Sequence, residues 1–133
     1  MSNAPATWEL YNLAPGEKKV REIKDTKIPN AATFEVQKED HTLGNLLRTQ
    51  LLKNSKVLFA GYKMPHPLHH SFVLKVQTTP ETSPLEVLQN DVNSLIREIS
   101  SIKLKFENEL TLHGLTQSEP MGGSMYNSVD TAY

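Results

Sequence analysis

The chain has 133 residues and a mass of 15.0 kDa, with 38% hydrophobic and 22% charged residues, which is the composition of one soluble globular domain. It contains no cysteine, so disulfide bonds, thiol catalysis, iron–sulfur clusters and cysteine-based zinc sites are excluded. The net charge of −1 lacks the basic surplus with which proteins that hold nucleic acid alone neutralise phosphates.

The N-terminal part is predicted to contain short strands joined by turns. WELYNL (8–13) is compatible with a short strand, and KKVREIK (18–24) alternates well enough for another. Pro15-Gly16 and Pro29-Asn30 mark turns. The start, MSNAPATWEL, lacks a basic region followed by an apolar segment, and no apolar run reaches the roughly 20 residues that cross a bilayer. We therefore expect a cytosolic or nuclear protein.

Three further segments are predicted to be strands. AATFEVQK (31–38) alternates apolar and polar residues, as a half-buried strand does. VLFAGYKM (57–64) is rich in aromatic and β-branched residues, and SFVLKVQTT (71–79) places alternate apolar residues on one face. MPHPLHH (64–70) contains two prolines and is expected to be a loop.

The segment KEDHTLGNLLRTQLLK (38–53) is predicted to form a helix. Asp40 is placed to cap its first free N–H groups, and leucines recur along one face. Gly44 interrupts this pattern, because glycine inside a helix costs about 1 kcal/mol relative to alanine. A glycine within a leucine stripe lets another backbone come close, so Gly44 indicates tight contact with a second helix. A slightly poor core helix is the alternative.

A second and longer helix is predicted over residues 84–113. Ser83, Pro84 and Glu86 have the spacing of a capping box with proline at the first helical position, and Gly114 is placed to end the helix. Apolar residues recur with heptad-like spacing. They are Leu85, Leu88, Val92, Leu95, Ile96, Ile99, Ile102, Phe106 and Leu110.

This second helix is too long for the domain that carries it. It would be roughly 45 Å long, whereas strands of a small sheet are about 20 Å long. Part of the apolar stripe is therefore expected to bind a second protein. The order strand, helix, strand, strand, helix favours an α+β two-layer sandwich. Residues 1–114 would form this domain, and the polar segment 115–133 would be a disordered tail.

The sequence gives little support for a catalytic or metal site. His66, His69 and His70 lie close together, but zinc needs a set of tetrahedral ligands and no cysteine is available, so a solvated loop is preferred. No serine or threonine stands in a nucleophile motif, and isolated glycines make no phosphate-binding loop. We expect no catalytic residue, metal or cofactor. A small acid–base enzyme that uses His41 and Asp40 is kept as an alternative.

The segment DHTLGNLLR (40–48) resembles the signature of the α-like assembly subunits of multisubunit RNA polymerases, the relatives of the bacterial α amino-terminal domain and of archaeal subunit L. VLFAGYKMPHPL (57–68), QTTP (77–80) and NAP near the start also resemble the small α-like subunit of eukaryotic RNA polymerase II. The similarity extends over residues 3–112. DHTLGN is shared with the small α-like subunit of polymerases I and III, which stays an alternative.

The resemblance implies a small, mostly antiparallel sheet with two helices on one face, in a non-catalytic nuclear subunit that serves mRNA transcription. The helices would pair with those of a larger α-like subunit, and this heterodimer would be the assembly platform for the two large catalytic subunits. Neither a membrane nor sequence-specific nucleic-acid binding is expected. A stand-alone dimerising transcription cofactor is the alternative from another class. The implied partner-binding residues are Thr42, Leu43, Gly44, Asn45, Leu46 and Leu47 in the first helix, and Leu88, Val92, Leu95, Ile99, Ile102 and Phe106 in the second.

Overall fold

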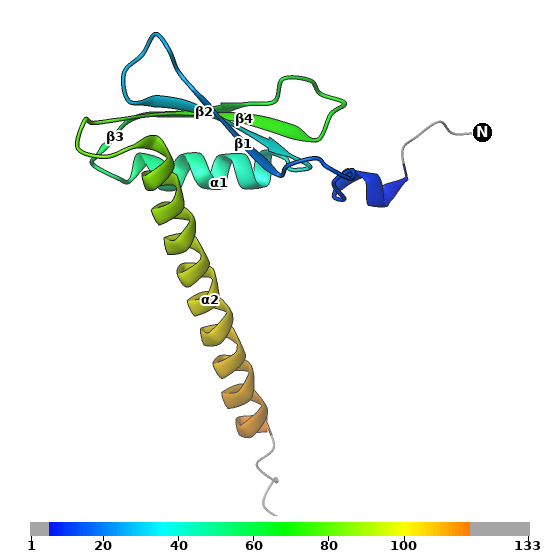
Figure 1. Ribbon diagram of the computed structural model, residues 1–133. Coiled ribbons are helices and arrows are strands. Elements are labelled where there is room, and N and C mark those ends of the chain that lie inside the picture. The colour runs from blue at the N-terminus through cyan, green and yellow to red at the C-terminus, as the bar shows by residue number, and fades with distance from the viewer. Residues whose placement is uncertain (1–5, 118–133) are drawn as a thin grey trace, which may run out of the picture. The chain divides into compact units, whose positions relative to one another are not determined.

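The computed structural model describes residues 6–117, with the side chains of residues 6–115. The chain has two compact units, Met1–Ile96 and Arg97–Tyr133. The first contains the sheet, the shorter helix and the start of the longer one. The elements in chain order (Figure 1) are the 3-10 helix η1 (Thr7–Leu10), β1 (Val20–Lys24), β2 (Ala31–Gln37), α1 (His41–Leu52), β3 (Val57–Lys63), β4 (Ser71–Thr78) and α2 (Pro84–Gln117).

The first unit is built on a four-stranded antiparallel sheet with the strand order β1-β2-β4-β3. In this sheet Phe34 of β2 pairs with Leu74 of β4, and Ala60 of β3 pairs with Val76 of β4. All four side chains are buried on one face, while the residues between them are not. The predicted alternation is confirmed in β2 and β4, because side chains two residues apart share a face.

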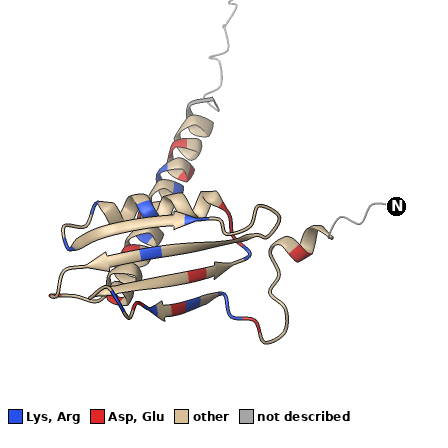
Figure 2. Ribbon diagram, turned by 90° about the horizontal axis from the view of Figure 1, so that it is seen from above, with Lys and Arg blue, Asp and Glu red and all other residues tan. Residues whose placement is uncertain are grey.

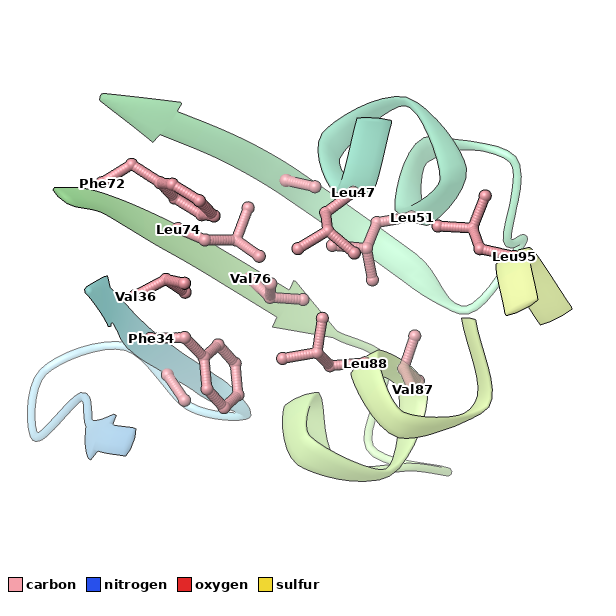
Figure 3. Packing of buried hydrophobic residues seen from close by; sticks show 12 residues of the cluster. Phe34, Val36, Leu47, Leu51, Phe72, Leu74, Val76, Val87, Leu88 and Leu95 are labelled. Carbon is pink, nitrogen blue, oxygen red and sulfur yellow. The ribbon is translucent and has the colours of Figure 1, made fainter. Parts of the chain in front are cut away.

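Helix α1 and the first turns of α2 cover this same face of the sheet. Their buried residues, which pack against the inner side chains of β2 and β4 (Figure 3), are Leu47, Leu51, Val87, Leu88 and Leu95. Fully burying a side chain of this kind stabilises by about 1.5–3 kcal/mol, so both helices are held mainly by apolar contacts. The predicted α+β fold with two helices on one face is confirmed.

The start of α2 is also as predicted. The Ser83 hydroxyl accepts a hydrogen bond from the Glu86 backbone N–H at 3.2 Å, as a capping residue does. The Glu86 carboxylate accepts a further bond from the Thr82 hydroxyl at 3.0 Å. The polar groups at the first turn of α2 are thus tied to the chain that enters it.

The predicted end of α2 is wrong, because the helix continues through Gly114 to Gln117. A glycine ends a helix by adopting a left-handed φ, and among the described glycines only Gly16 does so. Gly114 instead remains helical, at a cost of about 1 kcal/mol relative to alanine that the neighbouring turns outweigh. The predicted tail therefore loses its first residues to the helix, and residues 118–133 lie outside the described part of the chain.

The N-terminal segment also differs from its prediction. WELYNL was expected to be a strand, but Thr7–Leu10 forms η1. The N–H groups of Tyr11 and Asn12 both donate to the carbonyl of Trp8, at 3.4 and 3.0 Å. These local bonds use backbone groups that a strand would offer to its neighbour. The residue types of this short segment alone therefore do not decide between a strand and a 3-10 helix.

Candidate protein–protein interface

Helix α1 begins where the sequence predicts. The Asp40 side chain accepts a hydrogen bond from the Thr42 N–H at 2.9 Å and caps the helix. This bond holds the pKa of the Asp40 carboxyl below its usual range. The next residue, His41, has its Nδ1 atom 2.9 Å from the hydroxyl of Tyr62 in β3. The contact between His41 and Tyr62 therefore fixes the start of α1 against the edge strand β3.

Gly44 faces the sheet of its own chain. It is buried, and a β-carbon built on it would lie 2.7 Å from Cδ2 and 2.9 Å from Cε2 of Tyr62. The Tyr62 ring also packs edge-on against Phe72 in the core, with 6.0 Å between the ring centroids. The predicted role of Gly44 in admitting a partner helix is therefore wrong, because Tyr62 fills the space that the glycine leaves.

The other predicted residues of α1 divide between two faces of the helix. Leu47 is enclosed in the core and Leu43 packs partly against it. Leu47 therefore belongs to the chain's own interior rather than to an open surface. Thr42, Asn45 and Leu46 are exposed, and Asn45 and Leu46 lie three and four residues after Thr42, so that each neighbours Thr42 on the helix surface. This is the part of the predicted α1 surface that a second protein can reach.

In the first unit, the predicted residues of α2 lie on or beside the core. Leu88 and Leu95 are buried, and Val92 packs partly buried against the same cluster. These three side chains hold the start of α2 on the sheet. In this part of α2, a partner can therefore contact only the exposed portions of Val92 and Leu88.

In the second unit, the predicted residues of α2 are open to solvent. Ile99, Ile102 and Phe106 are 54%, 61% and 64% exposed. Spacings of three and four residues place them on one face of the helix. Contiguous exposed apolar side chains of this size are uncommon on soluble monomers and mark interaction sites. This face of α2 is the first candidate interface.

A groove of about 620 Å³ in the first unit adds a second candidate. It lies beside β1, whose five residues are all exposed. Val20 of this edge strand pairs with the buried Val36, so it points to the same side of the sheet as the core. The apolar residues that line the groove are Val20, Phe34, Leu85, Leu88 and Val92. Sequence reasoning missed Val20, because Glu22, two residues on, shares its face of β1 and interrupts the apolar pattern.

Basic and acidic residues are interspersed along the strands of the sheet (Figure 2). On its outer face Lys75 pairs with Asp25 at 2.8 Å, and the Arg21 Nε donates to Glu35 at 3.0 Å. A nucleic-acid-binding face would instead gather lysine and arginine. The surfaces of the described residues that suit a partner are therefore the apolar ones.

The histidine loop after β3 has a structural explanation. The His66 and His69 rings lie with their centroids 4.5 Å apart, and the His66 Nδ1 accepts a hydrogen bond from the Leu68 N–H at 3.2 Å. Within residues 6–117, no three His, Cys, Asp or Glu side chains gather as a metal site requires.

In the same part of the chain, no helix has the length and apolarity to cross a membrane.

The sequence of the chain matches a family model and several known proteins. The model of the RNA polymerase Rpb3/Rpb11 dimerisation domain matches residues 31–105, from β2 into α2. The DNA-directed RNA polymerase II subunit rpb11 of Dictyostelium discoideum is 49% identical over 104 residues, or 78% of this chain and 87% of that protein. The DNA-directed RNA polymerase II subunit RPB11 of Schizosaccharomyces pombe is 48% identical over 110 residues, or 83% and 89%.

A solved structure shares the fold. DNA-directed RNA polymerase subunit L of Thermoplasma acidophilum matches with a TM-score of 0.61 over 71% of this chain and 91% of that one. At 24% identity this likeness supports the architecture alone. The family model and the relatives, which are about half identical to this chain over most of both lengths, confirm the resemblance carried by DHTLGNLLR. The chain belongs to the RNA polymerase Rpb3/Rpb11 dimerisation-domain family.

Proposed function

We propose that this chain is a non-catalytic subunit of DNA-directed RNA polymerase II, acting in the nucleus. It pairs with the larger α-like subunit, and the pair is the platform on which the two large catalytic subunits assemble. Membership of a family described as a dimerisation domain supports the pairing. The names of the relatives favour polymerase II over polymerases I and III.

The exposed apolar face of α2 carries this proposal. Ile99, Ile102 and Phe106 are each more than half exposed. Fully burying a side chain of this size contributes about 1.5–3 kcal/mol, and the chain alone leaves most of that contribution unrealised. A helix of another chain that packs along this face would bury all three, because their heptad-like spacing keeps them on one side.

The proposed contact surface is smaller in α1 than the sequence suggests. Gly44 and Leu47 support the fold from inside and are left out. The first unit offers the open face of α1 and the groove beside β1, and the second unit offers the apolar face of α2. The proposed contact residues are Thr42, Asn45, Leu46, Val20, Leu85, Val92, Ile99, Ile102 and Phe106.

A structural role also accounts for the acid–base pair in α1. Asp40 caps the helix, and His41 bonds the Tyr62 hydroxyl. Both side chains thus have partners that explain their positions without a substrate. We therefore assign the chemistry of polymerisation to the two large subunits of the complex.

Co-expression with the larger α-like subunit of polymerase II, followed by size-exclusion chromatography with light scattering, tests the pairing. The parent chain should form a 1:1 complex. Phe106→Glu should abolish it, because burying an unpaired carboxylate costs several kcal/mol. Leu104→Glu is the matched control, since Leu104 is 58% exposed but lies about 200° around the helix from Phe106.

The outcomes separate the alternatives. Equal loss of pairing in both variants would place the contact on another face of α2. A parent chain that ignores the larger subunit and forms a stable homodimer would contradict the proposal and favour a stand-alone dimerising cofactor. Preference for the larger α-like subunit of polymerases I and III would transfer the role to those enzymes.

A further inference from the structure

The outer face of the sheet, which turns away from α1 and the start of α2, carries a partly apolar groove. On this face, Val73 and Lys75 alternate with the buried residues of β4 and pair with Lys63 and Gly61 of β3. Because the two helices pack on the inner face, no described element of the first unit lies over the outer one (Figure 2). The free face of such a sheet is usually polar, so an apolar groove there indicates a binding surface.

Phe59 and Gly61 of β3 shape this groove, whose volume is about 500 Å³. Phe59 is 50% exposed, and its Cζ atom lies 3.0 Å from where a β-carbon on Gly61 would be. The aromatic ring thus reaches over Gly61, while half of the residue stays open to solvent. A glycine inside a strand often marks a place that another group approaches closely. The outer-face residues that line the groove are Thr33, Phe59, Gly61, Lys63, Val73 and Lys75.

The charge of the groove comes from lysine. Lys63 and Lys75 are its only charged lining residues, so that no carboxylate lines it. Lys75 pairs with Asp25 at 2.8 Å, and elsewhere on the same face Arg21 pairs with Glu35. Lys63 is exposed and forms no ion pair with a carboxylate of the described residues. A carboxylate from outside the chain would complement its ammonium group.

The chemistry of the groove favours a protein segment as its occupant. Pockets for small molecules enclose most of their ligand, whereas this groove lies on an open sheet face with a half-exposed phenylalanine. Nucleic acid is held by several cations at once, and only Lys63 lacks a carboxylate partner here. The same face of a second copy would bring lysine against lysine. An apolar side chain with a nearby carboxylate fits Phe59, Val73 and Lys63.

We propose that this groove is a second docking surface, which binds a segment of a polymerase subunit other than the larger α-like one. An apolar side chain of that segment packs against Phe59 and Val73, and a carboxylate of the same segment pairs with Lys63. The exposed residues of α1 and the groove beside β1, which we assign to the larger α-like subunit, belong to the other side of the sheet. The inference rests on the proposed function, because it takes the partner from the same complex.

The composition of the purified polymerase tests this surface. The tagged full chain is expressed in cells with Phe59→Ala or, separately, with Lys63→Glu, and each co-purified polymerase subunit is quantified by mass spectrometry. In both variants the larger α-like subunit should stay at 1:1, which also shows that the chain folds, while the same other subunit falls about tenfold. Leu52→Ala is the matched control, because Leu52 is 52% exposed and lies on α1, which covers the inner face. It should retain every subunit.

A photo-crosslinking phenylalanine derivative at position 59 identifies the partner and keeps the aromatic ring. In the assembled polymerase it should link to a peptide that contains aspartate or glutamate, in the subunit that both variants lose. Replacing that acidic residue by lysine should restore the subunit to the Lys63→Glu chain, because the exchange of charges recreates the ion pair.

Full retention of every subunit by Phe59→Ala and Lys63→Glu would overturn the proposal. Links only to the larger α-like subunit or to nucleic acid would overturn it as well, and so would a charge exchange that restores nothing. Failure of the parent chain to pair with the larger α-like subunit would instead overturn the proposed function.

Discussion

The ring of Tyr62 lies against the backbone of Gly44, where a β-carbon on residue 44 would be 2.7 Å from the ring atom Cδ2. The contact joins α1 to the edge strand β3. His41 reinforces it from the first turn of the same helix, with its Nδ1 2.9 Å from the Tyr62 hydroxyl. The helix therefore carries a glycine, at a cost of about 1 kcal/mol in helix propensity, because an aromatic ring of its own sheet occupies the place of a side chain.

Gly44→Ala is expected to destabilise the fold even though alanine favours the helix. The added methyl group would meet Cδ2, Cε2 and Cγ of Tyr62 at 2.7, 2.9 and 3.2 Å, and Phe72 limits the retreat of the ring. Overpacking costs about 1–3 kcal/mol, and the gain in helix propensity is about 1 kcal/mol. The free energy of unfolding in denaturant should therefore fall by about 0–2 kcal/mol.

A double-mutant comparison makes this prediction sharper. With Tyr62→Ala as the background, the ring is gone and Gly44→Ala should stabilise by about 1 kcal/mol. The substitution thus changes sign between the two backgrounds. A stabilising effect in both backgrounds would mean that the Tyr62 ring moves aside at little cost. The contact would then not be the reason for a glycine at position 44.

The sequence predicts most of the sheet and both helices, because alternation, heptad-like spacing and capping residues act locally. It does not identify the group that approaches Gly44, since Tyr62 comes from another element and any close neighbour would require the same glycine. The choice between Leu46 and Leu47 is similar. Both belong to one leucine run, and only the position of the sheet decides that Leu47 is buried while Leu46 is exposed.

Asp25 is expected to contribute stability that is lost in acid. Its carboxylate accepts hydrogen bonds from Lys75 at 2.8 Å and from the N–H groups of Lys27 and Ile28 at 2.8 and 3.1 Å. These contacts, that of Lys75 first, lower its pKa from 3.8 to about 2. Because the folded pKa lies below the unfolded one, the contribution is complete above about pH 4 and disappears as the pH falls toward 2.

Asp25→Asn should therefore lower the denaturant midpoint of unfolding at neutral pH and approach the parent near pH 2. Glu81→Gln is the control, because Glu81 is mostly exposed and lies 3.8 Å from Lys56. Such surface pairs contribute little, so this variant should follow the parent at every pH. A deficit of Asp25→Asn that stays constant with pH would speak against the ion pair as its cause.

Asp91 is expected to act with the opposite sign. Its side chain is buried, and its Oδ2 atom has no hydrogen-bond partner among the described residues. Burial raises the pKa of the Asp91 carboxyl, and hydrogen bonding by Asn54 offsets this only in part. The folded state thus holds the proton more tightly, so stability falls as the pH rises from below 3.8 through the raised pKa.

Asp91→Asn keeps the shape of the side chain and removes its charge. It should raise the free energy of unfolding by about 1 kcal/mol at neutral pH and make little difference near pH 3. Unfolding in denaturant at both pH values measures this. A variant less stable than the parent at neutral pH would show that the folded chain stabilises the carboxylate rather than the protonated acid.

The free chain is expected to self-associate at micromolar concentration. Ile99, Ile102 and Phe106 are exposed on one face of α2, and two copies that meet along this face would bury the same side chains that we assign to the larger α-like subunit. Sedimentation velocity of the full chain should therefore depend on concentration. An equal amount of the larger subunit should replace the self-associated species with a heterodimer, because both compete for one surface. Phe106→Glu should suppress the self-association, whereas Leu104→Glu, on the opposite side of the helix, should leave it unchanged. A parent chain that stays monomeric both alone and with the larger subunit would contradict the proposed function.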